Sequence, residues 1–130
     1  MASRRQARKL ALTPDVFESL VQRAIQGLPV QYKNLLNNVA IVVEEEPSPD
    51  VLHDLGLESP DDLLGLYTGA AVGSESFFDP AGSMPARISI YRGPILRLCR
   101  TRKEVIREVR DTVAHEIGHH FGLGDDEMPY

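Results

Sequence analysis

The 130-residue sequence has a single cysteine, no tryptophan and no long hydrophobic run. The lone Cys99 excludes an intramolecular disulfide and is typical of a reducing compartment, so we expect a cytoplasmic protein. No stretch reaches about 18 consecutive apolar residues, the length that a transmembrane helix needs. The first ten residues are basic, but no apolar segment of the signal-peptide type follows them. We therefore expect neither a membrane anchor nor a secretory signal.

Basic side chains are missing from the middle of the chain. Residues 34–86 contain no Lys or Arg but ten Asp or Glu, and the formal net charge of the whole chain is −5. This balance is a poor match for a phosphate backbone, so we expect no nucleic-acid partner. The acidic segment is most simply a solvated surface, although it is also suited to attracting basic substrates.

The overall composition is that of an ordinary globular domain. Apolar residues make up 42% and charged residues 25% of the chain, and 130 residues suffice for one core. We expect a basic, flexible N-terminus over residues 1–12 and a single domain over residues 13–130, acting as a monomer.

Local patterns predict two long helices and three short strands. Thr13 and Pro14 favour a helix start, and an apolar stripe at three- and four-residue spacing continues to Leu28. Thr101 and Glu104 form a capping-box pattern before a second stripe, which predicts a helix from about residue 102 to residue 121. The expected strands are 38–43, 63–68 and 87–91, with a short helix at 49–56 and a loop at 69–84.

The last helix carries a metal-binding pattern. His115 and His119 are four residues apart, so they lie on one helix face and can bind one metal ion. Glu116 is offset by one position and lies beside the metal, where it can deprotonate a bound water. Zinc suits neutral imidazole ligands and leaves a coordination position open in catalytic sites.

A third ligand is needed, and the sequence offers Asp125 for it. Gly122 allows a sharp turn after the helix, so that Asp125 can fold back under the metal. His120 is a poor alternative because it lies about 100° further around the helix than His119. Asp126 and Glu127 are the remaining candidates.

The resulting H-E-x-x-H-x-x-G-x-x-D pattern resembles that of the zincin metallopeptidases, with aspartate in place of the third histidine of metzincins. Leu63–Tyr67, Arg87–Pro94 and His115–Gly122 are also similar to a family of short bacterial zincin-like proteins, the minimal zincins. The resemblance covers most of the chain from about Pro14. It implies an α+β, zincin-like fold in which a small mixed sheet packs on the N-terminal helix and on a C-terminal active-site helix. It also implies that His115, His119 and Asp125 bind the metal and that Glu116 is the general base.

The leading functional hypothesis is a zinc-dependent peptidase that acts on a peptide or protein through a metal-activated water. For substrate binding we expect strand 87–91 to pair with an extended peptide through Ile88, Ile90 and Tyr91 if that strand is an edge, or to be an ordinary core strand. Tyr91, Arg92 and Tyr130 are candidates for oxyanion stabilisation, and the carboxylate of Asp111 is a candidate for orienting a ligand.

The competing hypothesis is a catalytically silent zincin-like module that binds a peptide or protein. It is motivated by the absence of a motif-assigned oxyanion donor. It is also motivated by the five residues that follow Asp125, fewer than the methionine-turn segment of metzincins occupies.

Overall fold

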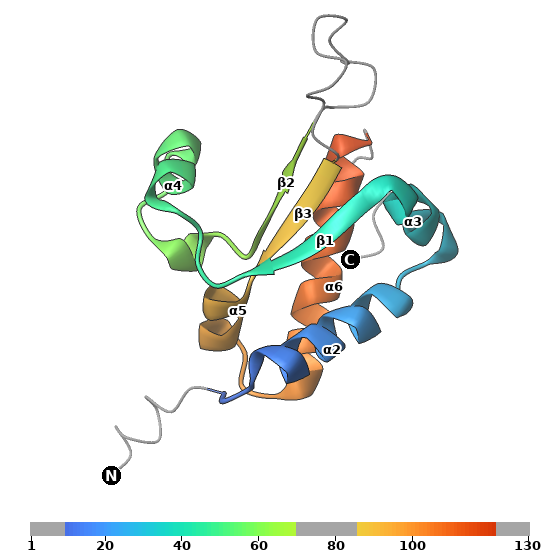
Figure 1. Cartoon of the computed structure of the whole chain (residues 1–130), viewed down its shortest axis with the longest axis horizontal. Helices are drawn as coiled ribbons and strands as arrows, with labels where there is room; N and C mark the ends of the chain where they lie inside the picture. The colour runs from blue at the N-terminus through green and yellow to red at the C-terminus, as the bar shows by residue number, and fades with distance from the viewer. Residues whose placement is uncertain (1–9, 70–85, 122–130) are drawn as a thin grey trace, which may run out of the picture.

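The computed structural model describes residues 10–69 and 86–121, which form a small mixed sheet with helices on one of its faces (Figure 1). The strands of these ranges are β1 (Val39–Glu44), β2 (Gly65–Thr68) and β3 (Ala86–Tyr91). The α-helices are α2 (Pro14–Gln26), α3 (Val30–Leu35), α4 (Pro49–Leu55), α5 (Arg92–Leu98) and α6 (Arg102–His120). Two 3-10 turns, η1 (Leu36–Asn38) and η2 (Pro60–Asp62), precede β1 and β2. Most of the expected loop at 69–84 lies outside the described residues.

Both long helices begin where the sequence predicts, because a threonine hydroxyl caps each one. Thr13 Oγ1 accepts a hydrogen bond of 3.2 Å from the Val16 amide, and Thr101 Oγ1 accepts one of 3.1 Å from the Glu104 amide. The Glu104 carboxylate in turn accepts from the amide of Arg100, at 2.8 Å. The capping box therefore closes one residue earlier than its usual form, in which that carboxylate binds the amide of the cap residue.

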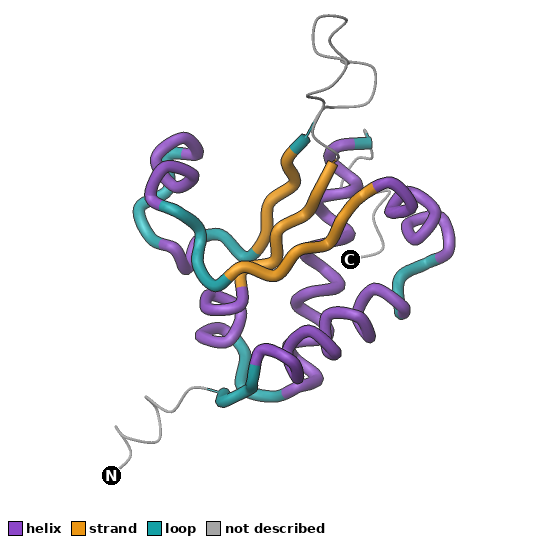
Figure 2. The backbone as a smooth tube through the Cα atoms, in the orientation of Figure 1, coloured by secondary structure: helices purple, strands orange, loops and turns teal. Residues whose placement is uncertain are grey.

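Strand β3 is the centre of the sheet. The strand order is β1-β3-β2, with β1 parallel and β2 antiparallel to β3. Figure 2 shows the three strands side by side. Ile88 faces Ile41 on one side and Tyr67 on the other, and all three side chains lie on the same face of the sheet. Ser89 faces Val42 and Leu66 on the opposite face.

The hypothesis that strand 87–91 offers a free edge to substrate is wrong. Its main chain pairs with a strand on each side, and its candidate substrate residues Ile88, Ile90 and Tyr91 are buried. The alternating polar pattern of this strand predicts only half-burial, yet Ser89 is also buried. The edges of the described sheet are β1 and β2.

The core lies between the sheet and a layer made of α2 and α6. Phe17, Leu20 and Val21 of α2 pack in one cluster with the apolar face of α6 and with the central strand. The α6 residues of this cluster, all buried, are Val105, Val109, Val113, Ala114 and Ile117. Burying each valine or isoleucine side chain of this set contributes roughly 1.5–3 kcal/mol, so this layer fixes α6 under the sheet.

The N-terminal boundary of the packed chain precedes the first helix. Leu12 belongs to the core cluster, and Leu10 packs against it. Arg92 donates a hydrogen bond to the main-chain oxygen of Leu12. Residues 10–12, which we expected in the flexible terminus, are thus in contact with the folded domain.

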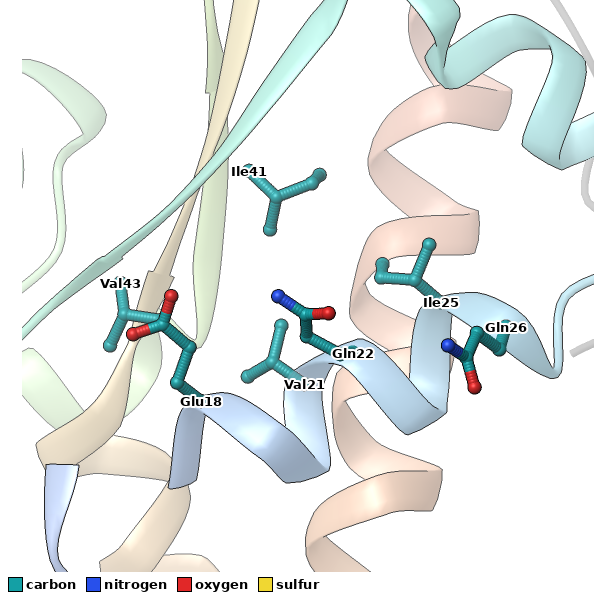
Figure 3. Close-up of a pocket in the computed structure, with 7 residues that line it drawn as sticks. All are labelled: Glu18, Val21, Gln22, Ile25, Gln26, Ile41 and Val43. Atoms are coloured by element: carbon teal, nitrogen blue, oxygen red, sulfur yellow. The ribbon is translucent and has the colours of Figure 1, made fainter. Parts of the chain in front are cut away.

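A small hollow lies between α2 and the β1 edge of the sheet (Figure 3). Val21 and Ile25 point toward Ile41 and Val43 across a cavity of about 230 Å³. Three polar side chains from α2 complete its lining: Glu18, Gln22 and Gln26. This hollow lies at the opposite edge of the sheet from β2.

The helix α5 follows β3 directly, and ion pairs hold it to the exit of β1. Arg92 pairs with Glu45 at 2.7 Å, and Arg97 makes a two-pronged contact with Glu46 at 2.8 Å. The Gly93 amide donates to the Glu45 carbonyl at 2.9 Å. The two glutamates after β1, which in the sequence look like a solvated strand end, are therefore matched by arginines of α5.

Candidate metal centre

His115, Glu116 and His119 occupy the last turns of α6, on the side of the helix that the core does not cover. His115 and Glu116 are half-buried and His119 is exposed, whereas Ile117 and Gly118 between them are buried. The ring centroids of His115 and His119 are 6.2 Å apart, with a 43° angle between the ring planes. The helix thus presents two imidazoles from consecutive turns to one patch of solvent, as the four-residue spacing predicts.

A main-chain carbonyl orients the His115 ring. Its Nδ1 lies 2.9 Å from the Asp111 carbonyl oxygen. A protonated Nδ1 donates to that oxygen, and this tautomer leaves the lone pair of Nε2 free for a metal. The Asp111 carboxylate instead accepts hydrogen bonds from Arg110. The residue therefore orients the ligand through its main chain rather than through its carboxylate.

Glu116 is bound to the edge of the sheet. Its Oε1 accepts a 2.9 Å hydrogen bond from the Tyr67 amide of β2. The neighbouring Tyr91 amide donates to the Leu64 carbonyl, so the main-chain groups of residue 64 face β3. In an antiparallel pair, residues two apart direct their main-chain groups to the same side. The main-chain groups of Gly65 and Tyr67 therefore face the free edge of the described sheet, where β2 has no strand beside it among residues 10–69 and 86–121. The carboxylate is thus held at the free edge of β2.

The side chain of the same tyrosine contacts the end of α6. The rings of Tyr67 and His120 are stacked, with centroids 3.7 Å apart and an interplanar angle of 24°. Tyr67 is buried and His120 is exposed, so the histidine covers the outer face of the tyrosine ring. The contact directs His120 to β2 rather than to the patch shared by His115 and His119.

An open groove of about 420 Å³ runs beside these residues. One wall is the segment that enters β2, from Asp62 to Gly65, and the other is the face of α6 from Glu108 to Glu116. Besides Glu116, three carboxylates line it: Asp62, Glu108 and Asp111. Burial, followed by the charge of Asp111, raises the pKa of the Glu108 carboxyl above its ordinary value. The groove is therefore acidic and open to solvent along its length.

Comparison with known proteins agrees with this arrangement. A family model described as zincin-like metallopeptidase matches residues 36–130, most of the chain. The chain belongs to the zincin-like metallopeptidase family. The expected zincin-like fold class, a small mixed sheet packed on an N-terminal and a C-terminal helix, is likewise confirmed.

A solved structure of similar fold is a conserved hypothetical protein from T. thermophilus. It is 28% identical to this zincin-like chain, with a TM-score of 0.57, and the match covers 85% of this chain and 94% of that one. No curated protein matches the chain significantly.

The possible metal ligands that the structure describes are of a type that zinc binds. They are two imidazoles, one of them with its Nδ1 directed to a carbonyl as in zinc-binding histidines. Within residues 10–69 and 86–121, no group of three or more His, Cys, Asp or Glu is placed to hold a metal. The predicted third ligand Asp125 and the alternatives Asp126 and Glu127 lie outside the described residues, so this ligand stays a prediction.

The two described residues that we considered for oxyanion stabilisation lie away from the candidate metal centre of this zincin-like domain. Tyr91 is buried on the sheet face opposite Tyr67, where burial and the charge of Glu44 raise its pKa. Arg92 is occupied by Glu45 and by the Leu12 carbonyl. Tyr130 lies outside the described residues.

No helix of the described ranges has the length and apolar character to cross a bilayer.

Proposed function

We propose that the chain is a zinc-dependent peptide hydrolase. The observation that carries the proposal is the juxtaposition of His115 and His119 with Glu116, whose carboxylate is held at the free edge of β2. Membership of the zincin-like metallopeptidase family supports the reaction class. A metal ligand pair, a carboxylate base and a strand edge are the parts that hydrolysis of an extended peptide requires.

Each residue has a separate role in this proposal. His115 and His119, with Asp125 as the predicted third ligand, would hold zinc. Bound zinc supplies a Lewis acid that polarises a peptide carbonyl and acidifies a water molecule. The Tyr67 amide fixes Oε1 of Glu116, which leaves Oε2 for taking a proton from water and passing it to the leaving amine.

The substrate strand in this proposal is β2 in place of β3. The Gly65 amide and carbonyl and the Tyr67 carbonyl face the open edge, so an extended peptide can pair with them. Such a peptide would lie over the groove that His115 and Glu116 line.

The first test is metal content, measured by elemental analysis on tag-free protein. We expect about one zinc per chain, lost in His119→Ala and retained in His53→Ala, which removes an exposed histidine of α4. A chain that neither contains zinc nor takes it up would contradict the zinc site.

The second test is Glu116→Gln, assayed on a broad peptide library. Zinc content should be unchanged, because Glu116 is not a proposed metal ligand. Hydrolysis should fall by at least about 100-fold, because the general base is lost. Chelator should abolish the wild-type activity and added zinc should restore it. Unchanged turnover in Glu116→Gln would remove this residue from the mechanism.

A silent peptide-binding module is the second candidate, favoured by one observation. The open edge of β2 can pair with a peptide whether or not a metal is bound. This candidate predicts peptide binding that survives Glu116→Gln and no cleavage of any library member. Zinc-dependent cleavage would rule it out.

A further inference from the structure

Tyr67 contacts α6 in two ways, once through its main chain and once through its ring. Its amide binds Glu116 at 2.9 Å, and its ring stacks on His120 at 3.7 Å. Residues 116 and 120 are four positions apart, so they lie on the same helix face one turn from each other. A single residue of β2 therefore spans the turn of α6 that contains His119.

We propose that the Tyr67–His120 stack is a positioning contact that keeps Glu116 bonded to the edge of β2 and keeps the His119 turn in place. The inference rests on the proposed function for its catalytic consequence, but the positioning itself concerns only contacts within the chain.

The position of the stack on the helix explains why such a contact is needed. The helix ends at His120, with Phe121 as its C-cap. Terminal turns fray because their last carbonyls have no partner within the helix. His119 is exposed in this turn, and the fully buried anchors Val113 and Ile117 lie further back along α6. Phe121, directly after the turn, is only partly buried against the core. Stacking on a tyrosine that is only 6% exposed ties the turn to the sheet.

The same stack also limits movement of the strand. The Tyr67 amide faces the free edge, where the Glu116 carboxylate is its partner. If His120 releases the tyrosine ring, the Tyr67 end of β2 loses one of its contacts with α6, and the amide–carboxylate bond opens more often. A histidine that merely fills surface would leave this bond unaffected.

The experiment is amide hydrogen exchange by NMR on the full chain, kept metal-free with chelator. In His120→Ala we expect the Tyr67 amide to exchange about 2- to 10-fold faster, the range that corresponds to the free energy of one aromatic stack. The amides of Ile88 and Ile90 in the central strand should keep their wild-type rates. Glu116→Ala removes the acceptor and gives the upper limit of the Tyr67 rate.

Matched variants separate positioning from general stability. His120→Phe keeps a stacking ring and should restore slow Tyr67 exchange, and His53→Ala should have no effect. The proposal is overturned if His120→Ala leaves Tyr67 exchange unchanged. It is equally overturned if Ile88 and Ile90 accelerate by the same factor, or if His120→Phe behaves as His120→Ala.

A kinetic readout tests the consequence for catalysis. On a peptide that the wild type cleaves, His120→Ala should lower kcat more than it changes KM, and His120→Phe should recover most of the loss. If the protein cleaves nothing but the exchange pattern holds, the proposed hydrolase fails while the positioning contact stands. If cleavage requires Glu116 but the exchange pattern is absent, the hydrolase stands and the positioning contact fails.

Discussion

Among single residues, Gly65 lies where β2 passes close to α6. A Cβ atom at this position would lie 2.6 Å from Cγ2 of Thr112 and 3.0 Å from the Ser89 carbonyl oxygen. We expect Gly65→Ala to lower the free energy of unfolding by about 1–3 kcal/mol, because the strand must move away from the helix. Chemical denaturation measures this loss.

A second substitution isolates the cause of that loss. Thr112→Ser removes the Cγ2 methyl, so the pair Gly65→Ala and Thr112→Ser should cost less than the sum of the two single changes. Strict additivity would show that the strain arises at the Ser89 carbonyl instead.

Glu108 predicts a stability that depends on pH. Burial and the neighbouring Asp111 raise the pKa of its carboxyl in the folded state, so folding favours the protonated form. The charged carboxylate therefore destabilises the fold at neutral pH, and this penalty disappears as the pH falls below the ordinary pKa. Arg107 lowers the pKa and offsets part of the shift.

We expect Glu108→Gln to raise Tm at pH 7 by no more than about 3 °C, since partial exposure screens the effect. The gain should vanish near pH 3.5. Thermal melts at the two pH values measure the difference, and an equal gain at both would assign it to helix propensity.

The residues of the candidate metal centre differ in how far the sequence alone identifies them. His115, Glu116 and His119 are found from local spacing, because a helix converts a four-residue interval into one face. Tyr67 is not, since its contact with Glu116 joins positions 49 residues apart and depends on how the helix packs against the sheet. Asp125 stays a prediction from the motif.

At the scale of elements, the N-terminal cap of α6 and its candidate metal-binding residues lie at opposite ends of the helix. The helix has 19 residues and is about 28 Å long, with the Thr101 cap at one end and His119 at the other. Thr101→Ala should lower the free energy of unfolding by about 1 kcal/mol, and Thr101→Ser should preserve it. Zinc affinity measured by competition with a chelator should not change in either variant. A large fall in affinity would contradict this separation.

The elements that sequence reasoning missed share a physical cause. The α3 and α5 helices have six and seven residues, too few to show a periodic apolar stripe. The strand ends at Tyr91, as expected, but contacts of the following residues with Glu45 and Glu46 then hold the helix α5 there. The central position of β3 could not be predicted from local patterns either, because strand order is a property of the assembled sheet.

At the scale of the whole molecule, the fold class was predicted from the resemblance to the minimal zincins. The local signals gave its parts, two capped amphipathic helices and three short β-rich segments, which are compatible with an α+β layer structure. The charge pattern predicted less of the structure. The acidic middle segment supplies both the ion pairs to α5 and one wall of the groove, and composition alone does not separate these two uses.

The mixed topology of the sheet also has a consequence for the order in which the chain folds. Pairing β2 with β3 closes a loop of 17 residues (69–85), whereas pairing β1 with β3 closes a loop of 41 residues (45–85). The difference in closure entropy disfavours the β1 pairing by about 0.8 kcal/mol. We therefore expect the antiparallel pair to form in the folding transition state and the parallel strand to join later.

Leu66 and Val42 flank Ser89 on the same sheet face and provide a matched comparison. Leu66→Ala should mainly slow folding, whereas Val42→Ala should mainly speed unfolding, and stopped-flow chevron plots measure both rates. The reverse pattern would place the parallel pair first. In the expected order, the strand edge that carries Tyr67 exists before the far side of the sheet is complete.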